Sequence, residues 1–195
     1  MELAVVTAAL DERPPSNADD RSNAQHDEDL RRLVGAAQRG DRAAFAKLYE
    51  RYYRMVHGIA LTRVLAHEAQ DVAQEVFVTM MKRIHTLREP AGFGGWLVAI
   101  TRNRATDFAR RRKPAVALSE TVPAPGDPRS ASIETLQLIR SLPEAYHETL
   151  ILRFVEGLSG PEIAAQTGLT PASVRVNLHR GYCLLREKLA RESSP

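Results

Sequence analysis

Apolar residues recur at steps of three and four through the first half of the chain, which is the spacing of one face of an α-helix. The pattern predicts four helices between about residue 29 and residue 113, and Gly40-Asp41 separates the first helix from the second. The third runs from about His67 to Ile84, and a loop from Arg88 to Gly92 precedes the fourth. The apolar positions are Leu30, Leu33, Val34 and Ala37 in the first helix; Phe45, Leu48, Tyr49, Tyr52, Val56 and Ile59 in the second; Val72, Val76, Phe77, Met80 and Ile84 in the third; and Phe93, Trp96, Leu97, Ile100 and Phe108 in the fourth.

Two stretches lack any apolar period. Residues 1–26 contain Pro14-Pro15 among Ser, Asn and Asp, so we expect a disordered N-terminal extension. Residues 114–131 place prolines and a glycine among small residues, which is typical of a flexible linker.

The helical pattern resumes after the linker, at Ile133, Leu136, Ile139 and Leu142. No segment alternates apolar and polar residues as a half-buried strand does. The predicted fold class is therefore all-α, with two small helical domains at residues 27–113 and 132–192.

The second of these domains ends in the pattern of a helix-turn-helix. Ser159 and Glu162 form a capping box at the start of a short helix, and Gly168 provides a turn. Thr170 and Pro171 are the residues expected at the start of a longer helix. This geometry places a recognition helix in the major groove of DNA, although an ordinary helical hairpin has the same local signals.

Composition limits the class of protein. The 195 residues are 26% charged and 44% hydrophobic, which is typical of a soluble protein. No apolar run of about 18 residues and no secretory signal are found, so we expect a cytoplasmic protein. The single cysteine, Cys183, excludes an intrachain disulfide and a Cys-x-x-Cys metal site. No catalytic, metal-binding or cofactor-binding arrangement stands out, so the chain is predicted not to be an enzyme.

The net charge of +3 is unevenly distributed. Residues 1–27 are mainly acidic, whereas the segment from Thr101 to Lys113 holds six basic residues and one acid, Asp107. Because this basic run continues a helical pattern, it indicates a helix that contacts a polyphosphate such as DNA. A solvated basic surface is the alternative.

Two sets of motifs occur in a fixed order along the chain. The first set is Asp71-Val72-Ala73-Gln74-Glu75-Val76-Phe77, Phe93-Gly94-Gly95-Trp96-Leu97, and Asn103-Arg104 with Asp107 and the basic run. The second is Leu142-Pro143, Leu152-Arg153-Phe154, Glu156-Gly157-Leu158-Ser159, Glu162-Ile163-Ala164 and Leu178-His179-Arg180. Over about residues 27–190 the chain resembles bacterial RNA polymerase sigma factors of the extracytoplasmic-function (ECF) type.

The resemblance implies a function in transcription initiation. The first domain, which is similar to sigma region 2, would bind the clamp helices of the largest core polymerase subunit and melt the −10 promoter element. The second, which is similar to sigma region 4, would read the −35 element and contact the flap of the other large subunit. An anti-sigma factor that controls the protein is also implied.

Residue roles follow where the sequence matches the family. Five residues opposite the apolar side of the third helix would bind core polymerase: Asp71, Gln74, Glu75, Val78 and Lys82. The −10 element would contact Arg102, Asn103, Arg104, Arg110, Arg111, Arg112 and Lys113, and the loop from His85 to Gly92 would hold a flipped base. Trp96 fits the apolar core better than a base-stacking platform.

The recognition helix has an expected inner and outer side. Val174, Leu178, Gly181, Leu185 and Leu189 are predicted to pack inward, and the −35 element would contact Ser173, Arg175, Val176, Asn177, His179 and Arg180. Arg175 and Asn177 are the base-reading candidates, and His179 and Arg180 the phosphate contacts. The helix departs from the family where Tyr182-Cys183-Leu184 replaces basic residues, and we expect Cys183 to be exposed.

Two other functions remain open from the sequence. A stand-alone helix-turn-helix regulator would bind operator DNA unaided, and a sigma-like decoy would bind an anti-sigma factor without polymerase. A stand-alone regulator would have no use for the exposed residues of the helix around Asp71–Phe77. A decoy would be expected to lose the basic residues of Arg110–Lys113.

Overall fold

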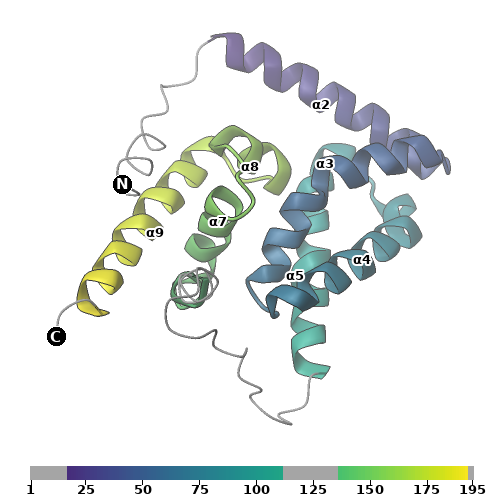
Figure 1. The fold of residues 1–195 in the computed structure, drawn as a ribbon. Coiled ribbons are helices and arrows are strands. Elements are labelled where there is room, and N and C mark those ends of the chain that lie inside the picture. Colours follow the sequence, from purple (N-terminus) through teal and green to yellow (C-terminus); the bar gives the residue numbers. More distant parts are fainter. Residues whose placement is uncertain (1–16, 112–135, 193–195) are drawn as a thin grey trace.

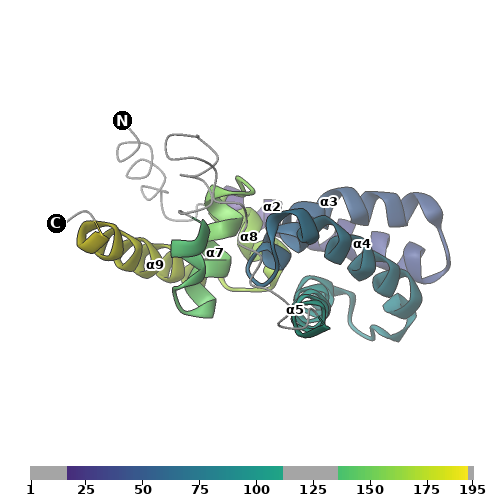
Figure 2. The same cartoon turned by 60° about the horizontal axis from the view of Figure 1, so that its bottom comes forward.

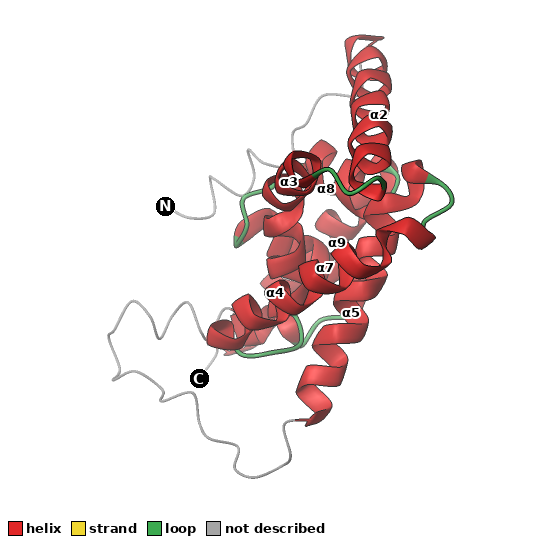
Figure 3. Cartoon of the chain, turned by 90° about the vertical axis from the view of Figure 1, so that its right-hand side faces the viewer, coloured by secondary structure: helices red, strands yellow, loops and turns green. Residues whose placement is uncertain are grey.

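The computed structural model describes residues 17–111 and 136–192, in which helices are joined by short loops and no strand is formed (Figures 1 and 3). The first domain consists of α2 (Asn17–Gln38), α3 (Arg42–Leu61), α4 (Ala66–Arg83) and α5 (Phe93–Arg111), with the short 3₁₀ helices η1 (Ile84–Thr86) and η2 (Pro90–Gly92) between α4 and α5. The second domain consists of a helical segment at 136–140, α7 (Glu144–Phe154), α8 (Gly160–Thr167) and α9 (Pro171–Glu192). The predicted all-α fold class is confirmed.

The first helix corrects one prediction. It begins at Asn17, so ten residues of the expected disordered extension are helical, while residues 1–16 lie outside the described part of the chain. The sequence from Asn17 to Glu28 contains neither proline nor glycine, and a helix that starts near Asp29 can therefore continue backward without a steric break. The predicted linker, residues 114–131, also lies outside the described residues.

The break between α2 and α3 forms as predicted. Gly40 adopts φ +88°, a left-handed conformation that favours glycine. The Asp41 side chain then accepts hydrogen bonds from the backbone N–H groups of Ala43 and Ala44, at 2.8 and 3.2 Å, and caps α3. The two helices pack against each other because the chain reverses at this point.

The apolar side of α4 is buried against α3 and α5. All five residues predicted for it are buried, namely Val72, Val76, Phe77, Met80 and Ile84. Phe93, the first residue of α5, is fully buried and meets Tyr52 of α3 edge to face, with ring centroids 4.9 Å apart. Trp96 is partly buried against this core, which agrees with the prediction that it packs rather than stacks on a base.

The helix-turn-helix has the capping chemistry expected from the sequence. Glu162 Oε2 accepts hydrogen bonds from the Ser159 N–H at 2.8 Å and the Ser159 hydroxyl at 2.7 Å, and Gly168 turns at φ +78°. The Ser173 N–H donates to Thr170 Oγ1 at 3.1 Å at the start of α9. Val174, Leu178, Gly181 and Leu185 are buried as predicted. The prediction for Leu189 is wrong: it is 46% exposed, in the last turn of α9.

Replacing Ser159 with alanine should destabilise the second domain by about 1 kcal/mol at neutral pH, the usual cost of losing an N-cap. Hydrogen bonds from the Ser159 backbone and hydroxyl lower the pKa of Glu162 below its ordinary value. A carboxylate whose pKa is lowered by folding stabilises the protein above its unfolded pKa of about 4.3, and this contribution is lost as pH falls through the folded pKa.

The difference in Tm between wild type and Ser159→Ala should therefore shrink as pH falls below about 4. Thermal melts followed by circular dichroism at neutral and acidic pH measure it, and Ser159→Thr, which keeps the hydroxyl, is the control. A difference in Tm that is the same at both pH values would contradict a role for the Glu162 carboxylate.

The two domains lie side by side, with α3 against α7 and α5 against α8 (Figure 2). We call this contact the interdomain seam and define it by Arg63, Gly94 and Arg102 of the first domain and Arg140, Glu144, Glu148 and Gln166 of the second. The buried apolar residues of both domains belong to one connected cluster. Among the described residues, no helix is both long and apolar enough to span a membrane.

Candidate nucleic-acid and polymerase interfaces

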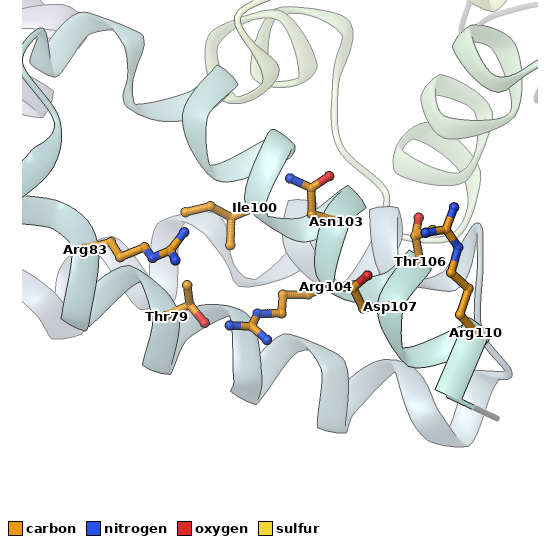
Figure 4. A pocket seen from close by; sticks show the side chains of 8 residues that line it. All are labelled: Thr79, Arg83, Ile100, Asn103, Arg104, Thr106, Asp107 and Arg110. Atoms are coloured by element: carbon orange, nitrogen blue, oxygen red, sulfur yellow. The ribbon is translucent and has the colours of Figure 1, made fainter.

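A polar groove of about 430 Å³ lies between α4 and α5 (Figure 4). Arg104 reaches from α5 toward α4, and Arg83 reaches from the last turn of α4 toward α5. Thr79, Ile100, Asn103, Thr106, Asp107 and Arg110 complete the lining. Three arginines with only one carboxylate give the groove a positive charge, which suits a phosphodiester backbone.

Arg83 is a residue of this groove that sequence reasoning missed. It lies four residues after Thr79 on α4, so both side chains share one face of the helix, and α5 packs beside that face. The spacing from Thr79 could have placed Arg83 on this face. That α5 brings Asn103 and Arg104 opposite Arg83 depends on how the two helices pack, which the pattern along α4 does not show.

The predicted −10 residues do not form one surface. Asn103, Arg104 and Arg110 line the groove, whereas Arg102 lies in the interdomain seam. Arg111 pairs with Glu75 of α4 at 3.4 Å and lies over the Phe108 ring. The remaining predictions, Arg112 and Lys113, fall outside the described residues.

A loop that runs from His85 to Gly92 borders the first domain between α4 and α5. Gln38 of α2 donates hydrogen bonds to the carbonyl oxygens of Ile84 at 3.1 Å and Leu87 at 2.8 Å. These bonds fix the backbone at the start of the loop, while His85, Thr86, Arg88 and Glu89 remain exposed. The loop therefore has a fixed backbone at its start and polar side chains that can contact a ligand at its surface.

The side of α4 that faces away from the core is exposed as predicted. Asp71, Gln74, Val78 and Lys82 are exposed, and Glu75 is half-buried by its contact with Arg111. Met81, which sequence reasoning did not include, is 57% exposed beside Val78, which is 49% exposed. Two large apolar side chains at adjacent turns, surrounded by polar residues, are typical of a protein-binding surface.

The recognition helix presents most of its predicted residues to solvent. Arg175, Val176, His179 and Arg180 are exposed, and the Ser173 hydroxyl lies 2.8 Å from Thr170 Oγ1. Cys183 is exposed as expected, with its Sγ 3.9 Å from His179 Nε2.

Asn177 is less exposed than Arg175 and Val176 beside it. It lines a cavity of about 190 Å³ between the domains, together with Gly95 and Arg102 of α5. Helical spacing places Asn177 to one side of the exposed residues, and there it is partly buried. The residues that line this cavity with it are far apart in the sequence, so the pattern along α9 alone could not reveal it.

Arg102 forms an ion pair with a carboxylate of the second domain, that of Glu148. Its Nε and Nη2 donate to Glu148 Oε1 and Oε2 at 3.0 and 2.6 Å. The hydrogen bond to Glu148 is the main cause that raises the pKa of Arg102 above its ordinary value, and desolvation by burial opposes it.

Both domains match known families. The Sigma-70 region 2 model matches residues 48–114, and the Sigma-70, region 4 model matches residues 132–182. The chain is 33% identical over 168 residues to the RNA polymerase sigma-H factor of Pseudomonas aeruginosa, an alignment that covers 76% of this chain and 87% of that protein. The chain belongs to the ECF family of RNA polymerase sigma factors.

Further similarities extend over most of this ECF sigma factor. It is 34% identical over 158 residues to the ECF RNA polymerase sigma factor SigE of Mycolicibacterium smegmatis, which covers 74% of this chain and 60% of the length of SigE. A solved structure of CnrH in complex with the cytosolic domain of CnrY shares the fold, with a TM-score of 0.58 and 24% identity over 84% of this chain and 99% of that chain. The α4–α5 groove lies within the region 2 match, and the exposed residues Arg175, Val176, His179 and Arg180 of α9 lie within the region 4 match.

Proposed function

We propose that this ECF sigma factor binds core RNA polymerase in the cytoplasm and directs promoter-specific transcription initiation. The observation that carries the proposal is the presence of both sigma regions in one chain, each with an exposed surface of suitable chemistry. Region 2 carries the arginine groove beside a mixed polar and apolar face of α4, and region 4 carries an exposed recognition helix.

The α4–α5 groove would hold the melted −10 element. Arg83, Arg104 and Arg110 can contact the phosphates of a single strand, and the Asn103 amide can hydrogen bond to a base edge. A base extruded from the duplex needs a site outside the stack, and the loop from His85 to Gly92 adjoins the groove-forming helices. Melting would then be favoured because the protein binds only the separated strand.

The exposed face of α4 would dock on the clamp helices of the largest polymerase subunit. Asp71, Gln74 and Lys82 supply polar contacts around Val78 and Met81, which would be buried by the partner. Region 4 would contact the flap of the other large subunit, and polymerase would thereby fix the distance between the two DNA-binding surfaces. An anti-sigma factor would control the protein by occupying these same surfaces.

Runoff transcription with purified core polymerase tests this function. We expect promoter-specific transcripts from a library of candidate promoter fragments only when both proteins are present. Absence of transcripts from the whole library would contradict it. Tight, specific binding of the free protein to a defined DNA site would instead favour a stand-alone regulator, and binding to an anti-sigma factor without binding to core polymerase would favour a decoy.

Arg175→Ala should weaken recognition of the −35 element by about 1–3 kcal/mol, because a bidentate contact to a guanine edge is lost. Core polymerase binding should not change, since Arg175 is exposed on α9, and α9 and α4 lie on opposite sides of the molecule (Figure 1). Arg186→Ala, also an exposed arginine on α9, is the control. A panel of promoter variants measures the effect, and an equal loss for every sequence would show that Arg175 contacts phosphate.

A further inference from the structure

A side-chain amide of α2 joins two carbonyl groups of the loop between α4 and α5. Gln38 Nε2 donates hydrogen bonds to the carbonyl oxygens of Ile84 at 3.1 Å and Leu87 at 2.8 Å, and both bonds are partly buried. The amide nitrogen carries two hydrogens, so one glutamine side chain can donate to both carbonyl groups at once. Gln38 therefore connects α2 directly to the backbone of the loop.

The two carbonyl groups lie at the start of the 3₁₀ turn η1 and just after its end. The Ile84 carbonyl also accepts a hydrogen bond from the Leu87 N–H at 3.1 Å, and Leu87 then leaves the turn with an extended backbone. Because Gln38 holds both ends of this turn, the backbone of His85 and Thr86 between them has little freedom. The side chains of these two residues are exposed, and the fixed backbone sets the directions in which they project.

The backbone that carries Gln38 is itself held at the end of α2. The Gly40 N–H donates to the Ala37 carbonyl at 2.9 Å, and the Asp41 N–H donates to the Ala36 carbonyl at 3.1 Å. This pair of bonds, with a left-handed glycine between the two donors' helix and the next, closes the end of a helix firmly. Gln38 is the last residue of α2 and follows the buried Ala37, so its amide reaches the loop from a rigid position.

The other end of the loop is held by packing. The second 3₁₀ turn, η2, packs against α2 and α5, and Phe93, which follows it, is fully buried. Arg88 and Glu89 lie between η1 and η2 and are exposed. The polar side chains of the loop therefore project from a backbone that is held on both sides, by Gln38 at η1 and by the packing of η2.

We propose that Gln38 is a positioning residue for −10 recognition, because it holds the loop from His85 to Gly92 in the conformation that receives the flipped base. This role rests on the proposed function, in which the loop binds that base. Gln38 itself does not contact DNA, since the loop carbonyls use both hydrogens of its amide. A loop that is already ordered binds its ligand without the cost of ordering, and its side chains keep one geometry, which favours one base over the others.

Gln38→Glu and Gln38→Met test the proposal because both remove the two donated hydrogen bonds and keep a side chain of similar length. Glutamate keeps the shape but presents only oxygen atoms to the two carbonyl groups at neutral pH, whereas methionine presents neither a donor nor a charge. Water can hydrate carbonyl groups at this surface, so both variants should fold, with wild-type helix content by circular dichroism. Gln137→Glu and Gln137→Met are the matched controls, at an exposed glutamine of the second domain.

Hydrogen–deuterium exchange of the free protein tests whether Gln38 anchors the loop. The reporters are the N–H groups of Leu87 and Gly92, which donate to the carbonyl oxygens of Ile84 and Glu89 at 3.1 and 3.0 Å. In both Gln38 variants these groups should exchange about tenfold faster, because local opening no longer breaks the two bonds from the amide. Exchange in α3 should not change, and the Gln137 variants should behave as wild type throughout.

The second measurement is base selectivity in the holoenzyme with core polymerase. The probes are fluorescein-labelled single-stranded oligonucleotides that carry the −10 sequence of a promoter active in the runoff assay, with each base changed in turn. In both Gln38 variants the preference at one position should fall about tenfold, while the other positions change by no more than about twofold. Affinity for core polymerase should not change, since Gln38 lies on α2 and the proposed docking face is on α4.

Three results would overturn the proposal. The first is loop exchange that neither Gln38 variant accelerates. The second is wild-type selectivity in Gln38→Glu, since donation by the amide would then be irrelevant. The third is an equal loss at every base, which would show that Gln38 only supports the stability of the domain. A wild-type holoenzyme without any preference along the −10 element would contradict the proposed function itself, whereas the exchange measurement depends on neither polymerase nor DNA.

Discussion

Phe93→Ala should lower the free energy of unfolding of the first domain by about 3–5 kcal/mol, the usual cost of truncating a fully buried aromatic residue. Phe93 has no exposed surface, and its ring lies 4.9 Å from Tyr52 and 5.8 Å from Trp96 between ring centroids. Alanine removes the apolar contact and leaves a cavity that the surrounding helices can fill only in part. The loss of the edge-to-face pair with Tyr52 adds to the cost.

Urea unfolding followed by circular dichroism measures this change. Phe154→Ala is the control, since Phe154 is 42% exposed at the end of α7 and should cost no more than about 0.5 kcal/mol. Equal destabilisation by the two substitutions would contradict the assignment of Phe93 to the core. Because Phe93 begins α5, its loss should also loosen the α4–α5 groove, and binding of single-stranded DNA should weaken as the temperature approaches the lowered Tm.

Val78→Glu should weaken binding to core polymerase by at least about 2 kcal/mol, or about 30-fold in Kd, if α4 docks on the clamp helices. Val78 is 49% exposed and adjoins Met81, so a partner that covers α4 would bury both. A carboxylate placed in the apolar part of such an interface would have to be desolvated without a partner. Folding stability should change little, because the substituted side chain faces solvent in the free protein.

Val155→Glu provides a control matched in chemistry and exposure, since Val155 is 50% exposed and lies in the second domain. Competition between labelled wild type and each variant for core polymerase measures the affinity. A loss of runoff transcription that parallels the loss of affinity would place the defect at polymerase binding. Unchanged affinity for Val78→Glu would show that the partner lies on another face of α4.

Much of the local structure was predictable because its causes are local. The burial of Val72, Val76 and Met80 follows from the 3.6-residue period, which puts them on one side of α4. The capping of α8 by Ser159 and Glu162 depends on two groups three residues apart. The same reasoning placed Arg175 and Arg180 on the outer side of α9, where they are exposed.

The sequence pattern does not reveal contacts that join distant parts of the chain. Arg102 belongs to the same basic run as Arg104, yet it pairs with Glu148, because α7 packs against α3 and brings Glu148 within reach of Arg102. Asn177 likewise lines a cavity with residues of the first domain. The pattern along one helix indicates which residues share a face, but it does not indicate which other helix packs against that face.

The sequence by itself therefore determined the helices, their caps and inner faces, and the ECF sigma family, since these depend on the spacing of side chains along the chain. Only the tertiary structure decided that the two regions pack together, that Arg83 joins the groove, and that Glu148 occupies Arg102. The physical reason is that pairing between domains depends on shape and charge at residues far apart in the sequence, 46 positions in the case of Arg102 and Glu148, and no local period records such a contact.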